Sequence, residues 1–329
     1  MNDDKQQNVQ IRSVSVVVPV FNSKGTLKKL VERIDEVLSE YAEAFEIILV
    51  NDGSRDSSWE VINDITSQNG NVRGINLMRN YGQHNALLAG IDRTRYDSII
   101  TIDDDLQNPP EEIPKLLDKL GEGFDVVYGK PIKRGHNSWR NLGSKIFKAS
   151  LKVVLGAEMG KQSSSFRAFR ALMRRGFSNF TDTNLALDVL LSWSAARVTN
   201  IPVQHDVRKG GKSGYTSKKL LRLAFNMITG YSTLPLRIAS SVGLFTSLFG
   251  LVIFFYVVIR RLMQTTYVPG FAFLSAEIAL FAGLQLFAIG VIGEYVARLH
   301  FRTMGKPPYI IREICGDISD MPAETTEKK

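Results

Sequence analysis

Two long apolar runs near the end of the 329-residue chain constrain its fold more than any other feature. Residues 238–259 carry no charged side chain, and residues 271–293 carry only Glu277. A helix rises about 1.5 Å per residue, so each run has roughly the length that crosses the hydrocarbon core of a bilayer. The rest of the chain is polar enough to be soluble. The sequence therefore predicts a hairpin of two transmembrane helices within residues 237–297.

The net charge of +8 is concentrated at the flanks of these runs. Four basic residues precede the first run and four follow the second, whereas only Arg260 and Arg261 lie between them. This excess places both flanks in the cytoplasm by the positive-inside rule, where basic residues also suit anionic lipid headgroups. We expect an inner (cytoplasmic) membrane protein that crosses the bilayer twice, with both termini cytoplasmic. The flanking residues are Lys218, Lys219, Arg222, Arg237, Arg298, Arg302, Lys306 and Arg312.

Other segments divide the remainder of the chain. Residues 1–11 are polar and lack the apolar core of a secretory signal. Residues 217–236 mix basic and apolar side chains at helical spacing, which favours an amphipathic helix on the membrane surface over an ordinary surface helix. Residues 298–329 are expected to form a cytoplasmic tail that is disordered from Asp317 onward. Cys315 is the only cysteine, so an internal disulfide is excluded.

Residues 12–216 alternate between predicted strands and predicted helices. This alternation is typical of a doubly wound, mostly parallel α/β sheet, in which ligands bind beyond the carboxyl ends of the strands. Polar clusters at residues 51–54 and 103–107 occupy such ends. Asn108 is expected to cap the helix that follows the second cluster. The predicted strands are residues 14–20, 45–50, 72–77 and 98–102, and the predicted helices are residues 26–38, 57–66, 84–93 and 108–120.

Three consecutive carboxylates, Asp103, Asp104 and Asp105, follow the last of these strands. Adjacent like charges repel unless a positive group lies nearby, and a divalent cation with oxygen ligands is the simplest such group. With Gln107 as a further oxygen ligand, the pattern favours Mg²⁺ or Mn²⁺ bound together with a substrate phosphate. The alternative is a solvated loop that caps the next helix.

Asp52 follows a buried strand and precedes a glycine turn. Its carboxylate is suited to a hydrogen bond with the ribose or base of a nucleotide, although a turn aspartate is common. The first strand is not followed by G-x-G-x-x-G, so the dinucleotide fingerprint is absent.

Four stretches together resemble the polyprenyl-phosphate glycosyltransferases of glycosyltransferase family two: residues 14–22, 51–54, 79–84 and 102–112. This group includes the dolichol-phosphate mannose synthases, the bactoprenol glucosyltransferases and the undecaprenyl-phosphate formamido-arabinose transferases. The likeness to the last is strongest in R-N-Y-G-Q-H and D-L-Q-N-P-P-E-E-I. It extends over about residues 12–315, including the paired apolar runs.

The resemblance implies a GT-A fold and inverting transfer of a sugar from a nucleotide diphosphate sugar, with UDP favoured. The acceptor would be undecaprenyl phosphate or a similar polyprenyl phosphate in the bilayer. A homotetramer is implied by relatives only, and no nucleic acid is expected among the partners. The identity of the sugar is left open.

The resemblance also implies roles for individual residues. Asp52 would contact the nucleoside, and Pro19 and Asn22 would line the same pocket. Asp103 and Asp105 would form the D-x-D motif, with Gln107 assisting at the metal and Asp104 in the variable middle position.

Residues 205–215 resemble the basic loop that such enzymes carry late in the catalytic domain. The resemblance implies that Arg208 holds the diphosphate, since a guanidinium matches the geometry of phosphate oxygens. Ser213 and Tyr215 belong to the same donor-binding loop. A surface charge near the membrane is the alternative reading of Arg208.

One position departs from the family pattern. Relatives carry an aspartate, usually proposed as a catalytic base, a few residues before a segment that matches Ser165, Phe166 and Arg167, but here the matching residue is Lys161. A phosphate monoester has its second pKa near 6, so it is mostly ionised at neutral pH and needs positioning more than deprotonation. Lys161 and Arg167 are therefore candidates to hold the acceptor phosphate, although Lys161 is equally consistent with a solvated loop residue.

Two other functions remain possible from the sequence. A processive polysaccharide synthase shares the fold and the D-x-D motif, but the chain lacks Q-x-x-R-W, and two spans are too few for a pore. A membrane-tethered nucleotide-sugar-binding protein without catalysis is favoured only by the missing aspartate.

Overall fold

The computed structural model describes residues 11–132, 163–177, 186–206, 225, 228–263 and 270–317. The chain divides into two compact units. The sheet unit comprises Met1–Asn141, Leu155–Tyr215 and Lys306–Lys329, and the helical unit comprises Leu142–Val154 and Thr216–Gly305. The predictions for residues 1–10 and for most of the amphipathic segment lie outside the described residues.

An eight-stranded sheet forms the centre of the sheet unit, in the order β7-β5-β6-β4-β1-β2-β3-β8. Neighbouring strands run parallel except at β6, which is antiparallel to β4 and β5, and at β8, which is antiparallel to β3. The predicted α/β fold with a mostly parallel sheet is confirmed. The strands are β1 Ser13–Val20, β2 Ala44–Asn51, β3 Val72–Leu77, β4 Ser98–Thr101, β5 Val126–Pro131, β6 Arg167–Arg170, β7 Val198–Val203 and β8 Ile311–Cys315.

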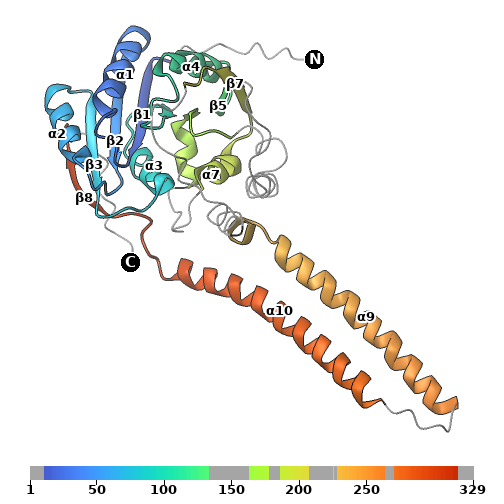
Figure 1. The fold of residues 1–329 in the computed structure, drawn as a ribbon. Helices are drawn as coiled ribbons and strands as arrows, with labels where there is room; N and C mark the ends of the chain where they lie inside the picture. Colours follow the sequence, from blue (N-terminus) through green and yellow to red (C-terminus); the bar gives the residue numbers. More distant parts are fainter. Residues whose placement is uncertain are drawn as a thin grey trace, which may run out of the picture. The chain divides into compact units, whose positions relative to one another are not determined.

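Helices cover both faces of this sheet (Figure 1). One core cluster packs α1, α2 and α4 against one face, and a second packs α3 and α7 against the other. In β1, Val16 and Val18 belong to the first cluster and Val17 to the second, which explains why this strand is an unbroken apolar run. The helices are α1 Leu27–Tyr41, α2 Ser58–Gln68, α3 Gln83–Ile91, α4 Ile113–Gly121 and α7 Leu187–Ser194, with short 3₁₀ helices at η1 Pro110–Glu112 and η2 Ala171–Gly176.

The predicted cap at Asn108 is wrong. Pro109 stands at the N-cap position of η1, no side chain caps that turn, and α4 begins only at Ile113. The Asn108 side chain is buried and its Oδ1 lies 3.3 Å from Nδ1 of His205. The Asn108 side chain, which the local sequence predicts to cap the helix, instead contacts a residue that is distant in the sequence.

Strand β8 was not predicted from the sequence, which suggested only a tail there. Its residues pair with the outer edge of β3, Ile314 opposite Ile75 and Cys315 opposite Gly74. A Cβ atom on Gly74 would lie 2.5 Å from Sγ of Cys315 and from Cγ2 of Ile62, so a larger residue would have to displace both side chains. The five-residue strand covers a sheet edge that would otherwise expose unpaired backbone groups.

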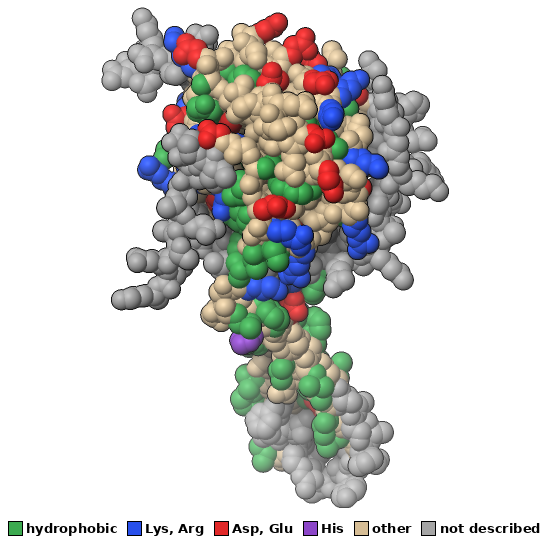
Figure 2. Space-filling view, turned by 90° about the vertical axis from the view of Figure 1, so that its left-hand side faces the viewer, with side chains coloured by type: hydrophobic (Ala, Val, Ile, Leu, Met, Phe, Trp, Pro, Cys, Tyr) green, Lys and Arg blue, Asp and Glu red, His purple; other side chains and the backbone are tan. Residues whose placement is uncertain are grey.

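The helical unit contains the two long helices that the apolar runs predicted, α9 Leu234–Met263 and α10 Phe271–Thr303. Leu234–Ile253 and Leu280–Thr303, with mean hydropathies of 1.8 and 1.7, are long and apolar enough to cross a membrane. Their large hydrophobic side chains are exposed, as Figure 2 shows. Exposure of this kind is stable in lipid and unstable in water.

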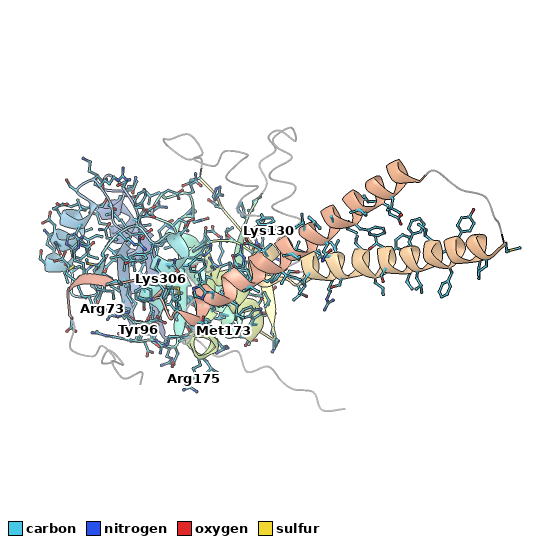
Figure 3. The ribbon with its side chains drawn as sticks, turned by 90° about the horizontal axis from the view of Figure 1, so that it is seen from below. Arg73, Tyr96, Lys130, Met173, Arg175 and Lys306 are labelled. Carbon is cyan, nitrogen blue, oxygen red and sulfur yellow. The ribbon has the colours of Figure 1, made fainter. Side chains whose placement is uncertain are left out.

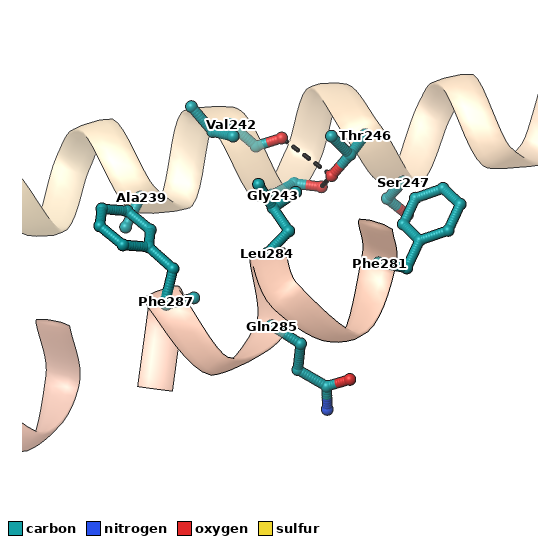
Figure 4. Close-up of a pocket in the computed structure, with 10 residues that line it drawn as sticks. Ala239, Val242, Gly243, Thr246, Ser247, Phe281, Leu284, Gln285 and Phe287 are labelled. Carbon is teal, nitrogen blue, oxygen red and sulfur yellow. Dashed lines mark hydrogen bonds between the residues drawn. The ribbon is translucent and has the colours of Figure 1, made fainter. Parts of the chain in front are cut away.

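A groove of about 510 Å³ lies between α9 and α10 (Figure 4). Within it, the Thr246 hydroxyl donates to the carbonyl oxygens of Val242 and Gly243, each at 3.0 Å. Near the other end of the pair, the Tyr295 hydroxyl donates to the carbonyl of Ser232 at 2.6 Å. The hydroxyls of Thr246 and Tyr295 are thus satisfied by backbone carbonyls within the same unit, as an apolar solvent requires.

A buried ion pair joins the first strands of the sheet. Arg73 on β3, which is labelled in Figure 3, donates to Glu46 on β2, and both side chains are almost fully buried. The other carboxylate oxygen of Glu46 accepts hydrogen bonds from the Ser15 hydroxyl at 2.6 Å and from the Arg95 amide at 2.7 Å. Burial lowers the pKa of Arg73, and the Glu46 carboxylate opposes that shift. Through these bonds, the Glu46 carboxylate connects the amino ends of β1, β2 and β3.

Replacing Arg73 by methionine should destabilise the sheet unit by about 3–5 kcal/mol, because it leaves the Glu46 carboxylate buried without a cation. The measurement is the thermal unfolding midpoint of the full chain in detergent, which should fall by roughly 2–4 °C for each kcal/mol. Arg12→Met is the matched control, since the Arg12–Glu43 pair is 63% and 65% exposed. An equal shift in both variants would show that burial of the pair is unimportant.

Candidate active site

The loops that follow β1 and β2 meet at the carboxyl edge of the sheet. The Asn22 amide donates to the Ser54 hydroxyl at 3.0 Å, and Asn22 Oδ1 accepts from the Arg55 amide at 2.8 Å. Asn22 has a φ of 56°, a left-handed conformation that asparagine tolerates better than most residues. Pro19 precedes this loop in β1, paired with Val50 of β2. Two of the residues predicted for the nucleotide pocket thus lie in β1 and in the loop after it, held against β2 and the loop that follows β2.

Asp52 is 3% exposed and organises the loop after β3. One carboxylate oxygen accepts the amide of Tyr81 at 2.6 Å, and the other accepts the amide of Gly82 at 2.9 Å. Burial raises the pKa of Asp52 to about 6, and these two amides oppose the rise. A raised carboxyl pKa means that the folded state holds the proton more tightly than the unfolded state. The stability it gives is therefore present at low pH and is lost as pH rises through about 6.

Gly53 allows that loop to approach β2. Its φ is +64°, and a Cβ atom there would lie 2.6 Å from the backbone carbon of Arg79 and from the backbone nitrogen of Asn80. Backbone atoms cannot rotate away, so only glycine fits at this position. The Asn80 side chain completes the contact by donating to the carbonyl of Asp52 at 3.1 Å.

Asp103 is held through both of its carboxylate oxygens. Oδ1 accepts from Nε2 of Gln83 at 2.7 Å, and Oδ2 accepts from the hydroxyl of Ser165 at 2.6 Å. Burial raises the pKa of Asp103, and the hydrogen bond from Ser165 opposes the rise. Sequence reasoning identified Asp103 but neither of its two partners.

Asp104, expected to be the variable member of the triplet, fixes the loop after β1. Its Oδ2 accepts from the Phe21 amide at 3.0 Å and from the Ser23 hydroxyl, and its carbonyl accepts from the Thr26 hydroxyl at 2.7 Å. Burial raises the pKa of Asp104 to about 6, and the Ser23 hydrogen bond opposes that rise. The middle carboxylate therefore has a structural task of its own.

Asp105 and Gln107 lie in a tight turn made possible by Leu106, whose φ is 59°. Asp105 Oδ1 accepts from the Gln107 amide at 3.1 Å, and the Gln107 carbonyl accepts from the Asp206 amide at 2.8 Å. The second contact attaches the start of the late basic loop to the acidic turn.

The donor set at this turn fits a hard divalent cation. Within the described part of the chain, no group of three or more His, Cys, Asp and Glu side chains is placed to enclose a metal. Mg²⁺ is commonly bound through one or two carboxylates, with waters and substrate phosphates completing its coordination. Asp103 and Asp105 supply such a pair, and no lysine or arginine hydrogen-bonds either carboxylate among the described residues.

Arg167 is not available to hold an anion, contrary to the expectation that it contacts the acceptor phosphate. It is 1% exposed, its Nη1 donates to Asp188, and its Nε donates to the Thr101 hydroxyl at 3.1 Å. The Tyr128 hydroxyl donates to the same Asp188 oxygen at 3.0 Å. Sequence reasoning missed Asp188, whose signal is an isolated carboxylate in the apolar stretch L-A-L-D-V-L-L.

The four remaining predicted site residues, Lys161, Arg208, Ser213 and Tyr215, lie outside the described residues. The structure brings together Pro19, Asn22, Asp52 and the acidic turn at one edge of the sheet, where α/β proteins bind ligands.

Comparison with known proteins places the chain among glycosyltransferases. Residues 15–179 match the family described as Glycosyl transferase family 2. The chain is 35% identical over 310 residues to the undecaprenyl-phosphate 4-deoxy-4-formamido-L-arabinose transferase of Serratia proteamaculans, covering 93% of this chain and 95% of that protein. It is 35% identical over 304 residues to the enzyme of the same name from Pseudomonas aeruginosa, covering 92% and 90%.

A solved structure supports the fold independently. The chain resembles a crystal structure described only as that of a mycobacterial protein, with a TM-score of 0.50 and 17% sequence identity. The match covers 67% of this chain and 75% of the other.

Gly53→Ala should detach the loop of residues 79–82 from Asp52, because the new Cβ atom meets backbone on the facing loop. Hydrogen exchange should show loss of protection at the amides of Tyr81 and Gly82. Gly25→Ala is the control, since a Cβ atom at Gly25 meets nothing within 4 Å. Protection that survives in Gly53→Ala would mean that the facing loop shifts without cost.

Proposed function

Because the chain belongs to glycosyl transferase family 2, we propose that it transfers a sugar from a nucleotide diphosphate sugar to undecaprenyl phosphate or a similar polyprenyl phosphate, with inversion. The observation that carries the proposal is the length of the match to the undecaprenyl-phosphate transferases. At 93% of this chain, it includes both the sheet unit and the two long apolar helices. A soluble glycosyltransferase would have no need of those helices.

The donor site in this proposal lies at the carboxyl edge of the sheet. Pro19 and Asn22 line the nucleoside pocket together with the loop that Asp52 holds. UDP is the proposed leaving group, and Arg208, with Ser213 and Tyr215, is proposed to bind its diphosphate. Asp52 itself is almost fully buried, so its contribution to the nucleoside comes mainly through the backbone that it positions.

A divalent cation, Mg²⁺ or Mn²⁺, is proposed to bind at Asp103 and Asp105 with assistance from Gln107. When bound, such a cation screens the charge that develops on the departing diphosphate. The contribution of the protein is to hold the carboxylates in place. Asp103 is fixed by two hydrogen bonds and Asp105 by the turn at Leu106.

The acceptor phosphate is its own nucleophile, because a phosphate monoester is mostly ionised at neutral pH. In the transfer, a phosphate oxygen forms a bond to the anomeric carbon as the bond from that carbon to the diphosphate oxygen breaks. No proton has to be removed, so the lysine that replaces the expected aspartate is compatible with the reaction. We propose that Lys161 binds this phosphate, whereas Arg167 supports the site through Asp188 and Thr101.

The helical unit is proposed to cross the inner (cytoplasmic) membrane with both flanks on the cytoplasmic side. A homotetramer is the proposed assembly, as the family resemblance implied. Gln285 of α10 extends away from α9 in Figure 4. Its amide lies within an apolar span, where it is suited to a hydrogen bond between copies of the chain.

Wild-type protein in detergent, given polyprenyl phosphate and a panel of nucleotide sugars, should yield one glycosylated lipid detectable by mass spectrometry. Asp105→Ala should abolish that product, and EDTA should do the same until Mg²⁺ or Mn²⁺ is restored. The control is Asp64→Ala, which removes an exposed carboxylate of α2 and should leave transfer unchanged. A wild-type protein that forms no lipid product from any donor would refute the proposed function, and full activity in EDTA would refute the metal.

The proposed orientation predicts which positions an impermeant thiol reagent reaches in intact cells. In a Cys315→Ser background, Thr265→Cys, between the two spans, should be labelled. Ser57→Cys, just before α2, should be protected until the cells are permeabilised. The reverse pattern would place the sheet unit on the outside.

A further inference from the structure

The loop of residues 79–82 and the first residue of α3 link two parts of the site that follow different strands. At one end, the amides of Tyr81 and Gly82 are bound by Asp52, which follows β2. The next residue, Gln83, is the first of α3, and its side chain reaches Asp103, which follows β4. Gln83 is therefore the point at which this loop meets the acidic turn.

The geometry around Asp103 is that of a carboxylate clamped from two sides. Gln83 donates to Oδ1 at 2.7 Å and Ser165 donates to Oδ2 at 2.6 Å. Ser165 is itself fixed, because its carbonyl accepts the hydroxyl of Thr101 at 2.8 Å. The two donors come from segments 82 positions apart in the sequence, so the clamp exists only in the folded sheet unit.

Neutral donors suit this task better than cations. A lysine or arginine at either place would neutralise the carboxylate and compete with a metal, whereas an amide and a hydroxyl leave its negative charge intact. Each carboxylate oxygen has two lone pairs, so one hydrogen bond leaves a second direction free for a ligand. Residues that orient metal ligands in this way set metal affinity as well as geometry.

We propose that Gln83 and Ser165 are positioning residues that fix the Asp103 carboxylate for the divalent cation. The inference rests on the proposed function, since it takes Asp103 as a metal ligand. It gives a role at the metal site to Gln83, the glutamine of R-N-Y-G-Q-H, and to Ser165, the serine directly before F-R. Both residues act through Asp103 and do not contact the sugar.

The test is Mn²⁺ binding to the full chain in detergent, measured by electron paramagnetic resonance with and without UDP. Gln83→Ala and Ser165→Ala should each raise the Kd for Mn²⁺ about tenfold or more. Ser165→Thr, which keeps the hydroxyl, should stay within about twofold of wild type by retaining that hydrogen bond. Gln68→Ala, an exposed glutamine at the end of α2, is the matched control and should change nothing.

A second readout separates positioning from general damage. In transfer assays, Gln83→Ala should need a higher Mn²⁺ concentration for half-maximal rate but should approach the wild-type rate at saturating Mn²⁺. The unfolding midpoint is recorded for each variant. If Gln83→Ala fails to fold, the comparison of Ser165→Ala with Ser165→Thr still decides the proposal.

The outcomes distinguish this inference from the function on which it rests. Wild-type Mn²⁺ affinity in both alanine variants would overturn the positioning role and leave the proposed function standing. The same result with weakened UDP binding in Gln83→Ala would reassign Gln83 to the nucleotide. A wild-type protein that binds no Mn²⁺ would instead refute the metal site, and the positioning role with it.

Discussion

The arrangement of the site depends on how buried and half-buried carboxylates are hydrogen-bonded by neutral groups. Asp52, Asp103 and Asp104 all lie at the carboxyl edge of the sheet, and burial raises the pKa of each. The hydrogen bonds to them come from main-chain amides, an amide side chain and hydroxyl groups. Each carboxylate also reaches a loop other than its own, so the loops after β1, β2, β3 and β4 form one network. The negative charge remains available to a ligand, while the bonds that stabilise it also set the shape of the site.

The local sequence was sufficient to predict the strands and helices that pack directly against the hydrophobic core. Strands β1 to β4 and helices α1 to α3 were predicted within a few residues, because their apolar periodicity reflects burial on one or two faces. The two long helices were predicted because an uninterrupted apolar run of this length has few stable structures other than a membrane-spanning helix.

Contacts between distant segments could not be predicted in this way. Arg167 resembled an anion-binding residue until the fold placed Asp188 beside it. Asn108 is a residue type that commonly caps helices and precedes a predicted helix, yet its side chain lies beside His205. Asp52 was predicted to belong to the site, but its hydrogen bonds to Tyr81 and Gly82 depend on a loop 29 and 30 positions away. In each case the order of the strands in the sheet brings the contacting residue near, and a single sequence does not specify that order.

Strand β8 has a consequence for the order in which the protein matures. It is made after both long helices, yet it pairs with β3, which is made before them. While the ribosome is still synthesising residues 78–310, the outer edge of β3 has no partner, and such an edge invites pairing with other chains. The sheet can be completed only after the helical hairpin has left the ribosome. Completion of the sheet therefore follows synthesis of the hairpin, and a chain that stops before β8 keeps an open sheet edge that quality control can recognise.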